Sequence, residues 1–230
     1  MAALFMVSLF LMFLITDIIV RKVQAARATA PAKVLAGNEL KIPFGLKVAD
    51  LALPGGLFFH KGHTWAGIDV SGKIKIGLDD FAQNVLGRID KIKLHKVGDT
   101  ISQGDTVFTI EQGKRKAKFN APVDGVISAI NEEVINNPEL LKNNPYEKGW
   151  IYSIKPNNLS QNIKSLSVAE EAKNWLKKEV TRFKEFIAEQ FVEDKVLGTT
   201  MADGGMPVKG IMEYMDDFSW MKMQEEFLAK

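Results

Sequence analysis

The sequence of 230 residues contains no cysteine. Disulfide bonds, thiolate metal sites and cysteine nucleophiles are therefore excluded. An excess of charge of either sign is also missing, because 30 lysine and arginine residues face 28 aspartate and glutamate residues, for a net charge of +2. Nucleic-acid binding needs a concentrated basic face. The composition therefore predicts no nucleic-acid partner.

Catalytic motifs are missing as well. No serine lies in a nucleophile elbow, and no glycine-rich loop precedes a helix in the way that cradles a phosphate. His60 and His63 are close in sequence, but His95 is distant. A metal site needs at least three convergent ligands. We therefore expect neither a catalytic site nor a metal site, and we interpret the chain as a non-enzyme.

A long apolar run occupies residues 2–20, with three polar interruptions. At 1.5 Å per residue a helix of this length spans roughly 28 Å, about the hydrocarbon thickness of a bilayer. Positive residues follow the run, from Arg21 onward, and the positive-inside rule then places the rest of the chain in the cytoplasm. The sequence therefore predicts a single-pass anchor over residues 1–22 in a bacterial inner membrane, with residues 2–20 in the lipid bilayer.

A cleaved signal peptide is the alternative for this segment, because Val23-Gln24-Ala25 loosely fits a small-residue cleavage site. A signal peptide carries its positive charges before the apolar run, whereas here they follow it. The order of the charges therefore favours an uncleaved anchor.

Residues 58–156 have the texture of a β domain, with short runs broken by glycine, proline and Asp-Gly pairs. Residues 106–110 alternate between polar and apolar side chains, as half-buried strands do. Residues 79–87 differ, because an acidic start and a terminal glycine predict a short helix there. Asp79 and Asp80 would point about 100° apart on that helix. We interpret them as helix N-terminal charges and not as a catalytic carboxylate pair.

The pattern becomes helical after Pro156. Ser167 and Glu170 form a capping-box signature, and apolar residues then recur at helical spacing over residues 172–191. Such a helix packs either on the β domain or on a partner subunit, and the sequence leaves both open. The predicted organisation is a transmembrane anchor (1–22), a linker and lead-in (23–56), a β domain (57–156) and an α-helical extension (157–230).

Several motifs follow one another along the β domain. They are Gly62-His63-Thr64-Trp65, residues 76–83, residues 121–127 and residues 136–140. Their content and order resemble the H protein family of the glycine cleavage system over residues 58–156. The resemblance implies a mainly β fold, namely a lipoyl-type flattened barrel or sandwich. It also implies that lipoate is carried on a lysine at the tip of a β-hairpin.

The resemblance assigns one lysine to this role. Counting back from Pro122 without gaps places the family pattern Glu-Ser-Val-Lys-Ala-Ala on residues 111–116, so that Lys114 is the candidate lipoyl attachment site. The surroundings differ from the family pattern, because Gly113, Arg115, Lys116 and Lys118 replace small and acidic residues. These basic neighbours change what a modifying enzyme would meet.

Two functional hypotheses follow. In the first, the chain is a non-catalytic, membrane-anchored accessory or assembly subunit of an inner-membrane complex, possibly of the electron-transport kind, with no cofactor of its own. Its partners are other subunits of that complex. In the second, the chain is a swinging-arm carrier with lipoate on Lys114, for the transfer of aminomethyl, acyl or sulfur groups. The mass of the chain at Lys114 discriminates between them.

Overall fold

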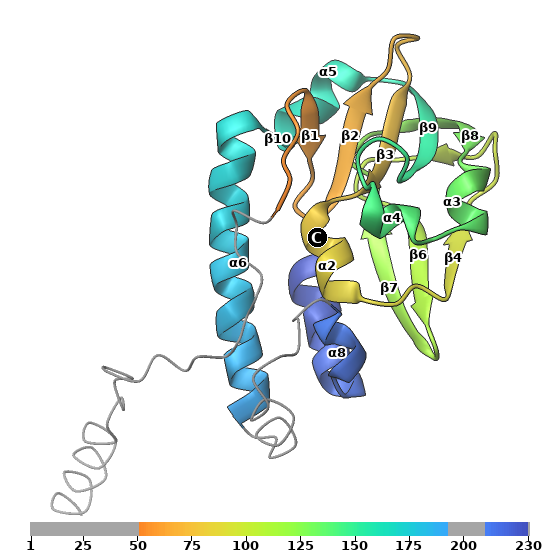
Figure 1. Cartoon of the computed structure of the whole chain (residues 1–230). Coiled ribbons are helices and arrows are strands. Elements are labelled where there is room, and N and C mark those ends of the chain that lie inside the picture. The colour runs from red at the N-terminus through yellow and green to blue at the C-terminus, as the bar shows by residue number, and fades with distance from the viewer. Residues whose placement is uncertain (1–50, 193–209, 230) are drawn as a thin grey trace, which may run out of the picture. The chain divides into compact units, whose positions relative to one another are not determined.

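The computed structural model describes residues 51–192 and 210–229 (Figure 1). The predicted anchor over residues 1–22, and with it the predicted contact of residues 2–20 with lipid, lies outside the described residues. Within the described ranges, no helix combines the length and the hydrophobicity that a bilayer span requires.

The β domain consists of two antiparallel sheets. A seven-stranded sheet has the order β10-β1-β2-β3-β9-β8-β5, and a three-stranded sheet has the order β4-β6-β7. The strands are β1 (Leu57–Phe59), β2 (Thr64–Ile68), β3 (Ile74–Leu78), β4 (Lys91–Leu94), β5 (Thr100–Ile101), β6 (Thr106–Gln112), β7 (Arg115–Asn120), β8 (Gly125–Ile130), β9 (Trp150–Pro156) and β10 (Ser167–Val168). The mainly β fold that the sequence predicts is confirmed.

Alternation of side chains explains how the small sheet joins the core. In β6, Phe108 and Ile110 point inward and are buried, while Thr109 between them is only partly covered. In β7, Ala117 and Phe119 are buried in the same way. The rings of Phe108 and Phe119 stack with their centroids 5.2 Å apart. The β6–β7 hairpin therefore has one apolar face on the core and one charged face toward solvent.

Short helices and one long helix complete the described chain. They are α2 (Asp80–Leu86), α3 (Glu132–Asn136), α4 (Leu140–Asn143), α5 (Leu159–Asn162), η2 (Ile163–Ser165), α6 (Ala169–Val192), η3 (Ile211–Tyr214), α8 (Asp217–Met223) and η4 (Gln224–Leu228). Asp79 caps α2, since its carboxylate accepts a hydrogen bond from the Ala82 amide at 2.8 Å. This is the helix-terminal role that the sequence predicts for Asp79.

The long helix α6 packs on the β domain and not outward. The Trp175 ring lies 5.1 Å from that of His63, and the Phe183 ring lies 5.3 Å from that of Phe81. The helix begins at Ala169, after Ser167 and Val168, which pair with β1 as strand β10. The predicted capping role of Ser167 is therefore replaced by a strand pairing. Of the two alternatives for the helical extension, the structure shows packing within this chain.

Residues 210–229, which we call the C-terminal segment, lie between α6 and the β6–β7 hairpin (Figure 1). On one side, the Arg182 guanidinium of α6 lies 4.2 Å from the centroid of the Phe227 ring. On the other side, the Trp220 indole N–H donates to the carbonyl of Lys116 in β7 at 3.3 Å. The segment therefore connects the helical extension to the hairpin.

Candidate functional site

Lys114 lies at the apex of the β6–β7 hairpin. Gln112 and Arg115 are the last paired residues, so that Gly113 and Lys114 alone form the turn. Gly113 has a φ of +59° and Lys114 does not have a positive φ, which is the pattern of a type II′ turn with glycine at its first central position. The Lys114 side chain is exposed. The structure therefore has the outward-pointing turn that the sequence predicts.

One side of the turn is fixed by the loop between α2 and β4. The Gly113 amide donates to the Asp90 carboxylate at 2.7 Å, and Arg88 pairs with the same carboxylate at 2.7 Å. The Gln112 side chain donates to the carbonyls of Leu86 at 3.0 Å and Arg88 at 2.7 Å. These bonds attach the apex of the hairpin to a neighbouring loop and hold the backbone beside Lys114 in place.

The other side of the turn is fixed by the C-terminal segment. Arg115 donates to the Asp217 carboxylate at 2.9 Å and to the Met212 carbonyl at 3.3 Å. The same guanidinium lies 5.5 Å from the centroid of the Trp220 ring. Glu213 accepts a hydrogen bond from the Arg88 amide at 2.5 Å. Lys114 therefore borders a polar hollow that is lined by both supports of the turn.

Sequence reasoning missed these supporting residues. Asp90 lies 23 positions from Gly113, and Asp217 lies 102 positions from Arg115. Contacts at such separations leave no periodic pattern in the sequence. A resemblance to a family also gives no information about a segment that the resemblance does not cover.

The amine of Lys114 is available for attachment. Among the described residues, Lys114 has no ion pair or hydrogen bond, and it is exposed at the apex of the turn. A lipoyl group needs an amine that projects clear of the domain, so that the attached arm can reach a separate active site. The position of Lys114 fits that requirement.

The solvent-facing side of the small sheet is basic. We use the term lysine face for the four exposed lysines that β4 and β7 contribute to this side: Lys91, Lys93, Lys116 and Lys118. Glu111 lies between them on β6 and pairs with Lys93 at 2.7 Å. Its hydrogen bond to Lys93 holds the pKa of Glu111 below its ordinary value, so this carboxylate is ionised at neutral pH.

A buried charge cluster lies at the junction of the β domain with α6. His63 is fully buried, its Nδ1 lies 2.8 Å from an Asp79 carboxylate oxygen, and its Nε2 lies 3.7 Å from a Glu179 oxygen. Burial is the largest single influence on the pKa of His63 and lowers it, but the two carboxylates together outweigh burial and raise this pKa above the ordinary value of 6.5. His63 therefore favours its protonated form more than a free histidine does, and its contacts join the start of β2, the start of α2 and α6.

The two neighbouring histidines do not share a site. His60 accepts a hydrogen bond from the Gly62 amide, and burial followed by the charges of His63 and Lys61 lowers its pKa to about 4. In residues 51–192 and 210–229 no three His, Asp or Glu side chains are grouped as metal ligands would be. His60 and His63 therefore have separate structural partners.

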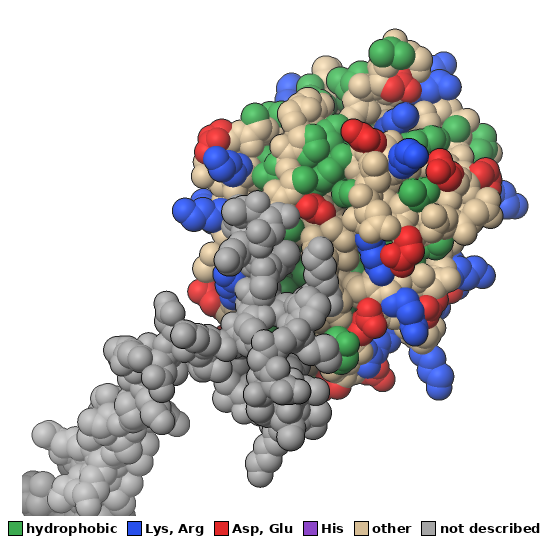
Figure 2. Space-filling view, in the orientation of Figure 1, with side chains coloured by type: hydrophobic (Ala, Val, Ile, Leu, Met, Phe, Trp, Pro, Cys, Tyr) green, Lys and Arg blue, Asp and Glu red, His purple; other side chains and the backbone are tan. Residues whose placement is uncertain are grey.

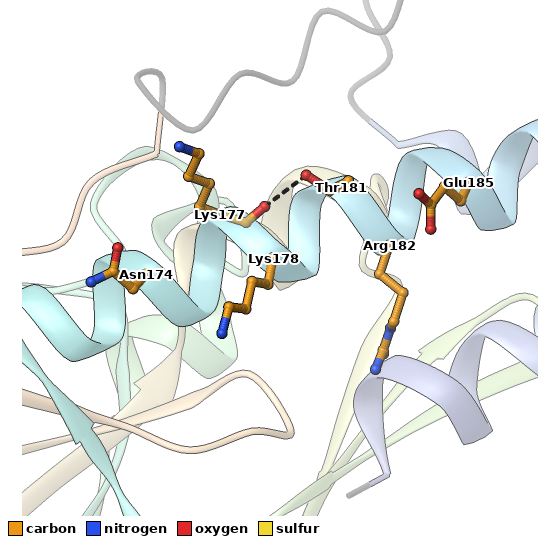
Figure 3. A pocket seen from close by; sticks show the side chains of 6 residues that line it. All are labelled: Asn174, Lys177, Lys178, Thr181, Arg182 and Glu185. Carbon is orange, nitrogen blue, oxygen red and sulfur yellow. Dashed lines mark hydrogen bonds between the residues drawn. The ribbon is translucent and has the colours of Figure 1, made fainter.

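A second hollow lies along α6 (Figure 3). Its lining residues are Asn174, Lys177, Lys178, Thr181, Arg182 and Glu185. The Thr181 hydroxyl donates to the Lys177 carbonyl at 3.0 Å, as Figure 3 shows. Every lining residue belongs to the same helix, and none forms a paired nucleophile and base. The hairpin tip remains the stronger candidate site.

Known proteins resemble the part of the chain that contains this site. The model of the family "Glycine cleavage H-protein" matches residues 57–179, from β1 into α6. The chain belongs to this family. The match extends beyond Pro156 into α6, and the C-terminal segment lies outside it. The resemblance that the motifs indicate is thus confirmed at the level of the family.

Individual H proteins match the same part of the chain. The "Probable glycine cleavage system H protein" of Pyrococcus horikoshii is 35% identical over 132 residues, which cover 57% of this chain and 98% of that protein. The "Glycine cleavage system H protein" of Listeria monocytogenes serotype 4a (strain HCC23) is 41% identical over 105 residues, which cover 46% of this chain and 83% of that protein. A crystal structure of the Mycobacterium marinum H protein has 25% identity and a TM-score of 0.46, and covers 55% of this chain and 98% of that one.

Proposed function

We propose that this H-protein family member is a lipoylated carrier protein and that Lys114 holds the lipoyl group. The observation that carries the proposal is the exposed, unpaired amine of Lys114 at the apex of a two-residue turn. Family membership adds support, because the resemblance implies lipoate on a hairpin lysine and an ungapped count reaches this same residue. The carrier hypothesis is thus better supported than the accessory-subunit hypothesis.

Attachment requires only the side chain of Lys114 and an activated acyl donor. The deprotonated Nζ forms an amide bond with the carboxyl carbon of activated lipoate. The bond from that carbon to its leaving group breaks, the leaving group takes the electron pair, and the amine proton passes to solvent. When bound, the dithiolane supplies sulfur atoms that carry an aminomethyl, acyl or sulfur group between enzymes. The chain itself would be a substrate of those enzymes and not an enzyme.

The residues around the turn have a positioning role in this proposal. Asp90 on one side and Asp217 on the other fix the two ends of the turn. A rigid root lets a flexible arm search a limited volume, which raises its effective concentration at an active site that docks beside the turn. The two-sided support of the hairpin is therefore suited to a swinging arm.

A second candidate is the membrane-anchored accessory subunit of an inner-membrane complex, with residues 1–22 as its anchor and the β domain in the cytoplasm. One observation favours it: the C-terminal segment lies outside the family match and packs on the base of the hairpin. Such an added element suits a fixed subunit with other subunits as partners. In this candidate Lys114 carries no lipoate.

The mass of the full-length chain, purified from its native host, discriminates between the two candidates. We expect an added lipoyl mass, located on a tryptic peptide that spans Lys114, because trypsin does not cleave after an acylated lysine. The Lys114→Arg variant should lose all of the added mass, whereas Lys116→Arg should retain it. An unmodified chain whose Lys114→Arg variant still supports assembly of a membrane complex would refute the carrier proposal and favour the accessory subunit.

A further inference from the structure

We infer that the lysine face is the docking surface for the enzyme that attaches lipoate to Lys114, and that this enzyme presents a carboxylate-rich surface to it. The inference rests on the proposed function, since it names the partner of the same site. Figure 2 shows basic side chains, with acidic ones among them, on the side where Figure 1 places the β6–β7 hairpin.

The register of the small sheet gathers the lysines. In the strand register, Glu111 on β6 lies opposite Lys91 on β4 and opposite Lys116 on β7. Thr109 lies in the same way between Lys93 and Lys118. Neighbouring strands are about 4.8 Å apart, so the two rows of lysines are about 10 Å apart across the sheet. Four ammonium groups therefore surround a single carboxylate and leave an excess of three positive charges.

The lysine face has little internal compensation. Lys93 and Lys116 share Glu111, at 2.7 Å and 4.0 Å. Lys91 and Lys118 have no ion pair within the part of the chain that the structure describes. The two rows of lysines lie on β4 and β7, on either side of β6, and their like charges repel one another across it. A carboxylate-rich partner would remove this repulsion, which gives the face a preference for an acidic surface.

The position of the face relative to Lys114 identifies the partner. A specific interface buries about 800 Å² on each side, which is far more than a two-residue turn offers. An enzyme that takes Lys114 into its active site must therefore also cover the strands next to the turn. The C-terminal segment already occupies the side of Arg115 and the β7 backbone. The open strand surface beside the turn is the lysine face.

Edge protection is the simpler explanation of these lysines. Both β4 and β7 are edge strands of the small sheet, and lysine on an edge strand hinders edge-to-edge aggregation. Glutamate would protect an edge equally well, whereas it would repel an acidic partner. Reversal of charge therefore separates the two explanations.

The test uses the full chain and the purified lipoate-attaching enzyme of the same organism. The face variant carries Lys91→Glu, Lys93→Glu, Lys116→Glu and Lys118→Glu. The matched control carries the same change of charge at exposed lysines on other elements, namely Lys148→Glu, Lys155→Glu, Lys164→Glu and Lys173→Glu. Both sets are made in the wild-type chain and in the Lys114→Arg chain, which binds without being modified.

Two quantities are measured: the dissociation constant of each Lys114→Arg chain for the enzyme, and the initial rate of lipoylation of each chain that retains Lys114. Loss of several complementary charges should weaken binding of the face variant by about 30-fold and reduce its rate similarly, while the control stays within about 2-fold. Raising the ionic strength should weaken wild-type binding more than binding of the face variant.

A two-site variant, Lys91→Glu with Lys118→Glu, should fold normally, because neither lysine forms an ion pair, and its affinity for the enzyme should fall by about 5-fold.

Each other outcome has a definite meaning. Equal affinities of the face variant and the control would overturn the docking surface, even if Lys114 is lipoylated. Salt-sensitive binding through the face without lipoylation of the wild-type chain would refute the proposed function and show that the face binds this enzyme without presenting Lys114 to it. Face-dependent binding to vesicles of one-third phosphatidylserine, with no effect of the face variant on the enzyme, would assign the face to lipid and overturn the inference.

Discussion

The hairpin tip and the buried junction at His63 use charge in opposite ways. At the junction, His63 is enclosed by Asp79 and Glu179, so each buried charge has a partner of opposite sign. At the hairpin, Lys114 is exposed and without a partner among the described residues. A charge that is paired inside a protein stabilises one arrangement of the chain, whereas an unpaired exposed charge remains available to another molecule.

Replacement of one carboxylate in each region should give the largest contrast. Asp79→Ala would leave the buried side chain of His63 without its closest hydrogen-bond partner and should lower the free energy of unfolding by about 3–5 kcal/mol. Asp90→Ala, in the exposed loop that contacts the apex of the hairpin, should lower it by about 1 kcal/mol or less. Urea unfolding of both variants measures the difference. Similar losses at the two positions would contradict the contrast.

The C-terminal segment, which connects the helical extension to the hairpin, should show the next largest loss of stability when it is mutated. Trp220 is buried and donates to the hairpin backbone, so Trp220→Ala should lower the free energy of unfolding by about 3 kcal/mol and speed amide hydrogen exchange around Lys116. Phe218 lies on the same helix but is 58% exposed, so Phe218→Ala should change stability by no more than about 0.5 kcal/mol. Unchanged exchange in Trp220→Ala would show that the C-terminal segment does not support the hairpin.

Substitutions in the turn itself should lower the free energy of unfolding by a smaller amount. Gly113 has a positive φ, and no atom lies within 4 Å of the position that a Cβ would take. Gly113→Ala therefore adds only backbone strain, which should lower the free energy of unfolding by about 1 kcal/mol. Gly113→Asn should lose less, because asparagine tolerates this backbone conformation. A loss above about 3 kcal/mol in thermal or urea unfolding would mean that the turn is not open to solvent.

The smallest expected effect comes from deprotonation of His63 as the pH rises. Because the pKa of His63 is raised above 6.5 in the folded chain, the protonated histidine contributes its full stability below pH 6.5, and this contribution declines as the pH rises through the folded pKa. Urea unfolding at a series of pH values above 6.5 should show this decline. His63→Asn keeps a residue that tolerates the φ of +61° and should remove the decline. A wild-type chain without any slope in this range would contradict the raised pKa of His63.

The two regions were not equally predictable from the sequence. The turn at Lys114 is implied by the family resemblance, through an ungapped count back from Pro122 along neighbouring residues. The junction is not, because Asp79 is 16 positions from His63 and serves two purposes at once. Its capping of α2 has a local signature, whereas its pairing with His63 depends on how the sheet folds over the helix.

Tertiary contacts also overrode one local signal. Ser167 and Glu170 predict a helix start, but Ser167 pairs with Phe59 as part of a strand. A capping box contributes about 1 kcal/mol, which neighbouring strand contacts can outweigh. The contact of the C-terminal segment with the hairpin likewise depends on the folded chain, and no sequence motif in residues 210–229 predicts it.

The support of the hairpin by the C-terminal segment also bears on biosynthesis. Residues 210–229 are translated after the H-protein domain, and domains fold as units while the chain is synthesised. The loop that carries Arg88 and Asp90 is present early, but Asp217 and Trp220 reach the ribosome exit later. A nascent chain would therefore display Lys114 on a hairpin with one support, and the second support would be added only when the following segment has been made.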